Sequence, residues 1–506
     1  MLSTRLPLDR LLVPVRQIGA RITESRLARY ASAILFLPVS PSEADWRALP
    51  HGGLLRSLFQ RKVRKSGDCF SLRIGSSAQT QLVVACLAGE AGTFERLQAA
   101  GKMVRSALDG DPQSLLVWQQ GCAQAAADLG FIAAVAALEA GAFRFASFKS
   151  KPKTRALLKH VDVARRGKLP DLDMTLATAA GNNLARWLTA LPPNALNAAT
   201  YRRLLRQFAQ RLQLRSTFHG ESSLKRLGCG AFLAVSSGNG TRDAGIALLS
   251  YRPRGAAAPA VSLVGKGICF DTGGTNLKTH KSMLDMHTDM EGSAVALGSL
   301  YALHALRSPL SVDCWLAITE NRIGPLAYKP QDVVSAANGT TIQVIHTDAE
   351  GRMVLADALC LAAAKRPRAI IDYATLTGAC VHALTERYSG AFTNRPDARG
   401  LIESAGRNSG ERVWCFPMDC DFDTDLESSV ADVMQCAVDP KGDHILAARF
   451  LNRFVPSNIA WLHLDLAAGT RHGGLAHIAS EITGFGVRYT LELLRSGWPP
   501  AASTRA

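Results

Sequence analysis

The chain has 506 residues, of which 47% are hydrophobic and 20% charged, and its formal net charge is +16. This balance excludes an intrinsically disordered chain and is typical of a globular protein. The length exceeds what one hydrophobic core usually organises, so we expect two domains. No uninterrupted apolar run reaches the roughly 20 residues of a membrane-spanning helix, so we expect no membrane association.

Eleven cysteines lie between Cys69 and Cys436 without paired spacing. This usage favours a reducing compartment over a disulfide framework. Near the N-terminus, arginines interrupt any apolar segment, so we expect no signal peptide and a cytoplasmic location. The same arginine-rich stretch has some resemblance to an organellar transit peptide.

The positive charge is concentrated at the N-terminal end. Residues 1–170 contain 25 Lys and Arg against 12 Asp and Glu, a net +13, which leaves only +3 for the remainder. A basic domain either binds a polyanion such as nucleic acid or simply presents a solvated basic face. No nucleic-acid-binding motif accompanies the charge, so both interpretations stay open.

In the first part of the chain, hydrophobic runs alternate with helical patterns. The patterns predict strands over residues 30–39 and 81–87, a helix over 93–108, and alanine-rich helical material within 115–138. Residues 149–172 are basic and contain proline, as exposed connectors do. We therefore predict an N-terminal α/β domain over residues 1–170 and a second, larger domain over residues 171–506.

In the second part, strands and helices alternate more regularly. Predicted strands cover residues 244–251, 260–264, 312–319, 341–345, 369–373 and 460–464. Predicted helices cover residues 176–190, 199–212, 292–306, 352–364 and 442–454. This alternation predicts a larger α/β/α sandwich around a mostly parallel sheet, preceded by the smaller α/β domain. Ligands of such sheets lie beyond the carboxyl ends of the strands, where we expect Lys266 and Asp348.

Two carboxylates one residue apart, Asp348 and Glu350, are the most informative feature of the chain. On an extended segment both side chains project to the same side, and Arg352 continues that face. Two like charges on one face repel each other unless a cation lies between them. The alternative is an exposed acidic turn at the start of a helix.

A glycine-containing block upstream adds Lys266, Asp271 and Lys278, and Asp289 follows it. Buried carboxylates are costly unless they are paired or bound to metal, so we expect a pair of divalent cations. A phosphate-binding GxGxxG loop is disfavoured, because Phe270 stands where its third glycine would be. Two simpler interpretations remain open: a surface position for Lys278 and a helix N-cap for Asp289.

These blocks resemble the leucyl (cytosol) aminopeptidases, which are two-metal exopeptidases. Val264 through Lys278 match the family pattern VGKGxxFDSGGxxLK, with Thr272 in place of serine. His346 through Leu359 match NTDAEGRxVLADAL, with His346 in place of asparagine. The C-terminal part carries the resemblance strongly, and the N-terminal part agrees only loosely.

The resemblance implies a metal-dependent aminopeptidase that releases the N-terminal residue from short peptides. Its implied metal ligands are Lys266, Asp271, Asp289, Asp348 and Glu350. Oxygen and amine ligands suit manganese, zinc or cobalt, and the sequence does not choose among them. A lysine ligand must be neutral, so we expect burial and the adjacent cations to depress the pKa of Lys266.

The resemblance also implies roles outside the metal ligands. Lys278 would stabilise the oxyanion of the transition state, and Arg352 would hold a bicarbonate ion that acts as general base. An apolar first residue is expected, because four residues match pocket-forming positions of the family: Met286, Thr375, Leu376 and Gly378. The resemblance further implies a homohexamer.

Two residues depart from the family pattern: Glu291, where glycine is usual, and His346. Either both lie outside the ligands, or one adds a ligand or alters the pocket. The second case would allow a homologue that binds peptides without cleaving them. A further alternative is a nucleic-acid-binding regulator that uses the basic N-terminal domain.

Overall fold

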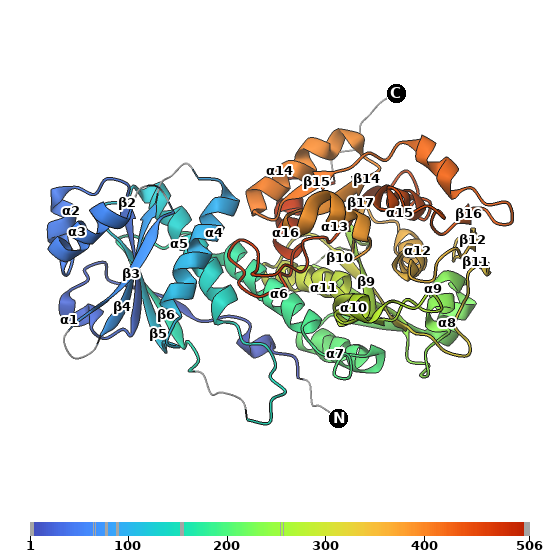
Figure 1. The fold of residues 1–506 in the computed structure, drawn as a ribbon, viewed down its shortest axis with the longest axis horizontal. Helices are drawn as coiled ribbons and strands as arrows, with labels where there is room; N and C mark the ends of the chain where they lie inside the picture. Colours follow the sequence, from blue (N-terminus) through green and yellow to red (C-terminus); the bar gives the residue numbers. More distant parts are fainter. Residues whose placement is uncertain are drawn as a thin grey trace.

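The computed structural model describes residues 5–63, 65, 67–75, 79–87, 91–151, 156–253, 255–256 and 258–499. These residues build two bodies that lie side by side, each with its own sheet and helices (Figure 1). The predicted α/β fold class is confirmed. We keep the division at residues 170 and 171 as a proposal.

The N-terminal body is built on a six-stranded sheet. In spatial order its strands are β1 (Val15–Ile18), β6 (His160–Ala164), β5 (Ser114–Gln119), β2 (Ser32–Pro38), β4 (Thr80–Leu87) and β3 (Cys69–Ile74). Neighbouring strands are parallel except for β3, which runs antiparallel to β4. Helices α4 (Thr93–Ala107) and α5 (Gln124–Ala142) pack on one face. The other face is covered by α1 (Glu24–Leu27), α2 (Glu43–Ala48) and α3 (Gly52–Lys62).

One sequence prediction for this body is refined and another needs correction. The helical material predicted within residues 115–138 is α5, and the apolar run at the start of that range forms the buried strand β5. Residues 149–172 are not wholly an exposed connector, because His160–Ala164 forms β6 between β1 and β5. The basic residues around this apolar stretch hid it from a compositional analysis, and residues 152–155 lie outside the described part of the chain.

Helix α5 is the one described helix that is long and apolar enough to cross a membrane. It packs against α4 and the sheet, and 67% of its most apolar stretch is buried inside the protein. These contacts make it a core helix of the N-terminal body.

The C-terminal body contains an eight-stranded sheet. In spatial order its strands are β15 (Val413–Cys415), β14 (Ser389–Thr393), β17 (Ala460–Asp465), β13 (Ala369–Ala374), β9 (Val261–Asp271), β10 (Val312–Asn321), β8 (Gly245–Tyr251) and β7 (Arg215–Gly220). The four central strands, from β17 to β10, are mutually parallel. Their carboxyl ends therefore meet along one edge of the sheet.

Helices cover both faces of this sheet (Figure 1). One face carries α6 (Asp173–Thr189), α7 (Ala198–Arg211), α11 (Glu291–Ala305), α14 (Arg399–Ser409) and α16 (Val487–Arg495). The other carries α8 (Glu221–Arg226), α9 (Gly230–Ser236), α12 (Glu350–Ala363) and α15 (Asp443–Asn452). Helix α11 lies close to β9, because a Cβ on Gly265 would stand 2.6 Å from the carbonyl oxygen of Gly292.

Short helices follow the carboxyl ends of two of the central strands. They are α10 (His280–Met283), which follows β9, and α13 (Gly378–Leu384), which follows β13. The predicted strand at residues 341–345 shortens to β12 (Thr341–Gln343), which pairs with β11 (Val333–Ser335) and β16 (Val433–Met434) in a separate small sheet. The alternation of strands and helices placed it in the main sheet. That expectation is wrong, because sequence periodicity does not reveal which strands pair with each other.

Candidate metal centre

The predicted site residues gather at the carboxyl ends of the four parallel strands. Asp271 ends β9, Asn321 ends β10, Thr375 directly follows β13, and Asp465 ends β17. The pairing of β9 with β10 shifts between Thr319 and Asn321, and such irregularities turn side chains toward functional sites. The site therefore lies where parallel sheets usually bind ligands, beyond the carboxyl ends of their strands.

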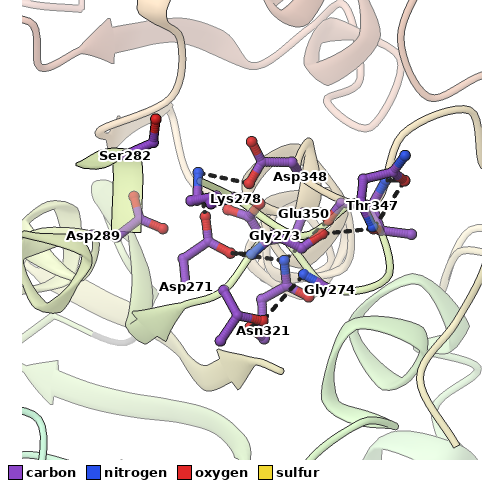
Figure 2. Close-up of polar contacts among 12 residues, drawn as sticks. Asp271, Gly273, Gly274, Lys278, Ser282, Asp289, Asn321, Thr347, Asp348 and Glu350 are labelled. Atoms are coloured by element: carbon purple, nitrogen blue, oxygen red, sulfur yellow. Dashed lines mark hydrogen bonds and ion pairs between the residues drawn. The ribbon is translucent and has the colours of Figure 1, made fainter. Parts of the chain in front are cut away.

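Lys278 lies between two of the carboxylates. Its Nζ is 2.9 Å from Oδ2 of Asp271 and 2.6 Å from Oδ1 of Asp348 (Figure 2). The side chain is 14% exposed, so it is not the surface lysine of the simpler interpretation. Gly273 permits this approach, because its φ is +85° and an added Cβ would stand 3.0 Å from Oδ1 of Asp348.

Lys266 joins the other two carboxylates. It lies inside β9 and not beyond its end, and its Nζ is 2.7 Å from Oδ1 of Asp289 and 2.9 Å from Oε1 of Glu350. The same nitrogen donates to the carbonyl oxygen of Thr375 at 2.9 Å. Asp289 is not the N-cap of α11, because Met290 occupies that position.

The segment that holds Asp348 and Glu350 is a turn, not a strand. Asp348 lies in this turn and Glu350 is the first residue of α12, so the expected alternation of an extended chain is wrong. The two carboxylates nonetheless converge: ligand oxygens of Asp271, Asp348 and Glu350 lie within 4.8 Å of one another.

Two carboxylate oxygens of the cluster have no hydrogen-bond partner among the described residues, which suits the cluster to a cation. Oδ2 of Asp289 and Oε2 of Glu350 are buried and accept no hydrogen bond from the described residues. Buried, unpartnered carboxylate oxygens are costly in a folded protein, and a divalent cation satisfies them. The residues present therefore fit a metal centre.

Burial and mutual repulsion perturb the carboxyl groups. Burial raises the pKa of Asp289 to about 8 against the opposing charge of Lys266. Burial and the charge of Asp271 raise the pKa of Glu350 to about 7 and that of Asp348 to about 6. The centre therefore holds more negative charge than the chain accommodates easily.

The two lysines respond in the opposite direction. Burial alone lowers the pKa of Lys266, but Asp289 and Glu350 raise it more, so its pKa lies above the ordinary value. The pKa of Lys278 is raised in the same way by its two carboxylate partners. The chain's own residues therefore do not produce the depressed pKa expected for Lys266, and a cation bound by this amine would have to displace its proton.

A cavity of about 270 Å³ opens onto the cluster. All eleven predicted site residues line it: Lys266, Asp271, Lys278, Met286, Asp289, Asp348, Glu350, Arg352, Thr375, Leu376 and Gly378. Met286 comes from a short 3₁₀ helix, Met286–Thr288, and Leu376 and Gly378 from the loop and helix after β13. Val381 and Leu466 add further apolar surface.

Arg352 is buried at the wall of the same cavity. Its Nη2 lies 2.8 Å from both carboxylate oxygens of Asp443, and its Nη1 donates to the carbonyl oxygen of Gln435 at 3.3 Å. Its Nε has no hydrogen-bond partner among the described residues. Because guanidinium donors bind oxyanions, this side chain is suited to hold one.

The two departing residues lie outside the described lining of the cavity. Glu291 is buried against Gly469, whose added Cβ would stand 2.3 Å from Oε2, and burial raises its pKa to about 8. His346 is exposed, and its Nδ1 accepts from the backbone N–H of Asp348 at 3.2 Å. An asparagine side chain makes the same kind of bond in turns, which explains the replacement physically.

Sequence reasoning missed the residues that support the ligands. Asn321 donates to Oδ1 of Asp271 at 2.8 Å and to the carbonyl oxygen of Thr347 at 3.0 Å (Figure 2). Asp443 holds Arg352, and Asp465 lines the cavity. The sequence offered one indication of these residues: Asn321 and Asp465 end strands of the sheet, and Asp443 begins a helix.

Comparison with known proteins bears directly on this centre. The profile of the cytosol aminopeptidase family, catalytic domain, matches residues 183–491. A probable cytosol aminopeptidase of Parasynechococcus marenigrum is 37% identical over 440 residues, which cover 85% of this chain and 89% of that protein. A probable cytosol aminopeptidase of Roseiflexus castenholzii is 38% identical, and the alignment covers 71% of this chain and 75% of that protein. The chain belongs to the cytosol aminopeptidase family.

Membership in the cytosol aminopeptidase family makes the chain a metal-dependent aminopeptidase. A solved structure supports the fold: the bottromycin maturation enzyme BotP in complex with Mn has a TM-score of 0.79 and 30% identity. The alignment covers 92% of this chain and 99% of BotP, so it includes the N-terminal body.

Proposed function

We propose that the protein releases N-terminal residues from short peptides through a two-metal centre. The observation that carries the proposal is the convergence of four carboxylates and two lysines in one cavity. Lys266, Asp271, Asp289, Asp348 and Glu350 would hold two divalent ions, manganese or zinc. When bound, such ions supply an activated water and polarise the scissile carbonyl.

Lys278 is the proposed oxyanion stabiliser. Its raised pKa keeps the amine protonated, and its contacts with Asp271 and Asp348 hold it at the mouth of the centre. A fixed cation beside the scissile carbonyl favours the negative charge that develops there.

Arg352 is the proposed holder of a bicarbonate ion that serves as general base. The support is its buried guanidinium, whose Nε has no partner among the described residues and which Asp443 fixes in orientation. A base held in this way accepts the proton of the attacking water.

The first residue of the substrate is proposed to be apolar. The support is the apolar lining near the centre, to which Met286, Leu376, Val381 and Leu466 contribute. Assembly as a homohexamer is proposed from the family resemblance alone, and a cytoplasmic location is proposed from that resemblance together with the cysteine usage.

The decisive experiment measures activity and metal content on the same protein. Metal-stripped and metal-restored enzyme is assayed with leucine p-nitroanilide and dipeptides. We expect the enzyme to be active only after the metal is restored. The restored wild type should contain about two metal ions per chain, and Asp271→Asn should contain fewer. Asp397→Asn, an exposed carboxylate, is the matched control. Two bound ions without cleavage would support the peptide-binding alternative instead.

A further inference from the structure

A second cavity lies in the N-terminal body, where it is lined by residues between Ala20 and Arg166. Its volume is about 810 Å³, against about 270 Å³ at the metal centre. Small-molecule sites usually have volumes of about 300–1,000 Å³, so this one is large enough for a nucleotide. Family membership assigns it no role in peptide cleavage.

The cavity lies beyond the carboxyl ends of three neighbouring parallel strands. Residues 20–22 follow β1, residues 118–121 end and follow β5, and residues 164–166 end and follow β6. It straddles the sheet, because the end of α2 on one face and the start of α5 on the other both contribute residues.

The path of the chain makes this position distinctive. From β2 the chain passes to the edge strand β3 and then to β4 on one side, and it returns past β2 to β5 and β6 on the other side. The connection from β2 to β3 uses α2 and α3, whereas the connection from β5 to β6 uses α5 on the opposite face. The order therefore reverses between β2 and β5, and sheets of this kind bind ligands at carboxyl ends beside such a point. Of these two strands, β5 contributes residues to the described lining of the cavity.

The lining of the cavity is strongly basic. Four arginines line it: Arg21, Arg47, Arg165 and Arg166. Neither aspartate nor glutamate occurs among the described lining residues. Several guanidinium groups around one concave surface favour an anion with several oxygens, above all a phosphate.

Arg165 is the most strongly fixed of these cations. Its side chain is 4% exposed, it forms an ion pair with Asp128, and its guanidinium carbon is 5.5 Å from the centre of the Phe131 ring. Burying a guanidinium is costly, and these contacts hold it in one orientation at the cavity wall. Within the described part of the chain, Nη1 is engaged by Asp128 and Nε by the carbonyl oxygen of Arg166, which leaves Nη2 as the fixed donor for a ligand.

The remaining lining combines apolar surface with amide groups. Leu49, Pro50 and Trp118 provide the apolar part. Oε1 of Gln119 accepts from the backbone N–H of Cys122 at 3.0 Å, which leaves the amide nitrogen of this glutamine as a donor. A ligand that carries both a phosphate and a flat or apolar group matches this combination of lining residues.

We propose that this cavity binds a small phosphorylated ligand of nucleotide size. The arginines hold its phosphate groups, and Leu49, Pro50 and Trp118 contact its less polar part. The site is separate from the metal centre, so the proposal does not depend on the proposed function.

The test is isothermal titration calorimetry on the full-length protein. The probes are ADP, pyrophosphate, inorganic phosphate and uncharged adenosine, with a single-stranded oligonucleotide as competitor. Arg21→Gln/Arg166→Gln changes two exposed lining arginines, and Arg73→Gln is the matched control, because Arg73 is exposed on β3 at the opposite side of the sheet.

We expect ADP to bind once per chain and adenosine to bind at least about tenfold more weakly. The double variant should bind ADP roughly tenfold or more weakly than the wild type, whereas Arg73→Gln should bind ADP with unchanged affinity. The aminopeptidase activity of both variants should equal that of the wild type. The proposal is overturned if no phosphorylated probe binds below about 1 mM. It is also overturned if the double variant binds ADP normally, or if the oligonucleotide binds and ADP does not displace it.

Discussion

Replacing Gly351 by alanine isolates the geometry of the metal centre from the stability of the fold. A Cβ at this position of α12 would stand 2.7 Å from Cε and Nζ of Lys266 and 2.9 Å from Cδ1 of Leu376. Ordinary contact begins at 3.4 Å, so the lysine tip must move by about 0.7 Å. Carboxylate and carbonyl oxygens at 2.7–2.9 Å hold that tip, so it cannot move without losing contacts.

We expect kcat/KM of Gly351→Ala on leucine p-nitroanilide to fall about ten- to a hundredfold, since a displacement of roughly 1 Å at a catalytic group costs about a hundredfold. The fold should survive, because alanine gains about 1 kcal/mol of helix propensity over glycine, which offsets part of the crowding. Gly400→Ala in α14 is the matched control, because an added Cβ there meets nothing within 4 Å. Activity and metal content equal to the wild type in Gly351→Ala would refute the proposed role of Lys266 as a ligand.

Three further changes test separate parts of the structure. Lys278→Gln should lower kcat about a hundredfold with the metal content unchanged, as stopped assays and metal analysis would show; loss of metal would contradict an oxyanion role. Asn321→Ala should weaken metal affinity about ten- to a hundredfold, measured by chelator competition, because Asp271 loses its side-chain donor. Burial raises the pKa of Glu139 in α5 to about 8 against 4.5, so the wild type should lose up to about 1.4 kcal/mol of stability per pH unit between pH 5 and 8. Glu139→Gln should remove this loss. If the melting temperatures of the wild type and of Glu139→Gln depend equally on pH, the raised pKa of Glu139 is contradicted.

Local sequence patterns predicted the elements better than their partners. The helix at residues 292–306 and the strand at 312–319 appear within a few residues of their predicted bounds, as α11 and β10. The strand β6 was missed, because basic residues surround its short apolar run. The pairing of β12 outside the main sheet was missed as well, since periodicity records local conformation and says nothing of the neighbouring strand.

The candidate site shows the same division. The two motif blocks, with Asp289 between them, named the four clustered carboxylates and both lysines, because these residues stand within short segments of the chain. The supporting residues Asn321, Asp443 and Asp465 lie on separate elements, and only strand order brings them to the centre. The turn at Asp348 was also misjudged, because an acidic residue is compatible with a turn, a strand end or a helix start.

The fold class, the family and the charged residues that gather in one cavity could all be predicted from the amino-acid sequence, since these depend on side-chain chemistry and spacing within short segments. Three properties required the folded structure: Lys266 lies within β9, its carboxylate partners hold its proton, and arginines far apart in the chain line one cavity in the N-terminal body. Those properties depend on distances between segments and on burial, which are fixed when the strands take their order in the sheet.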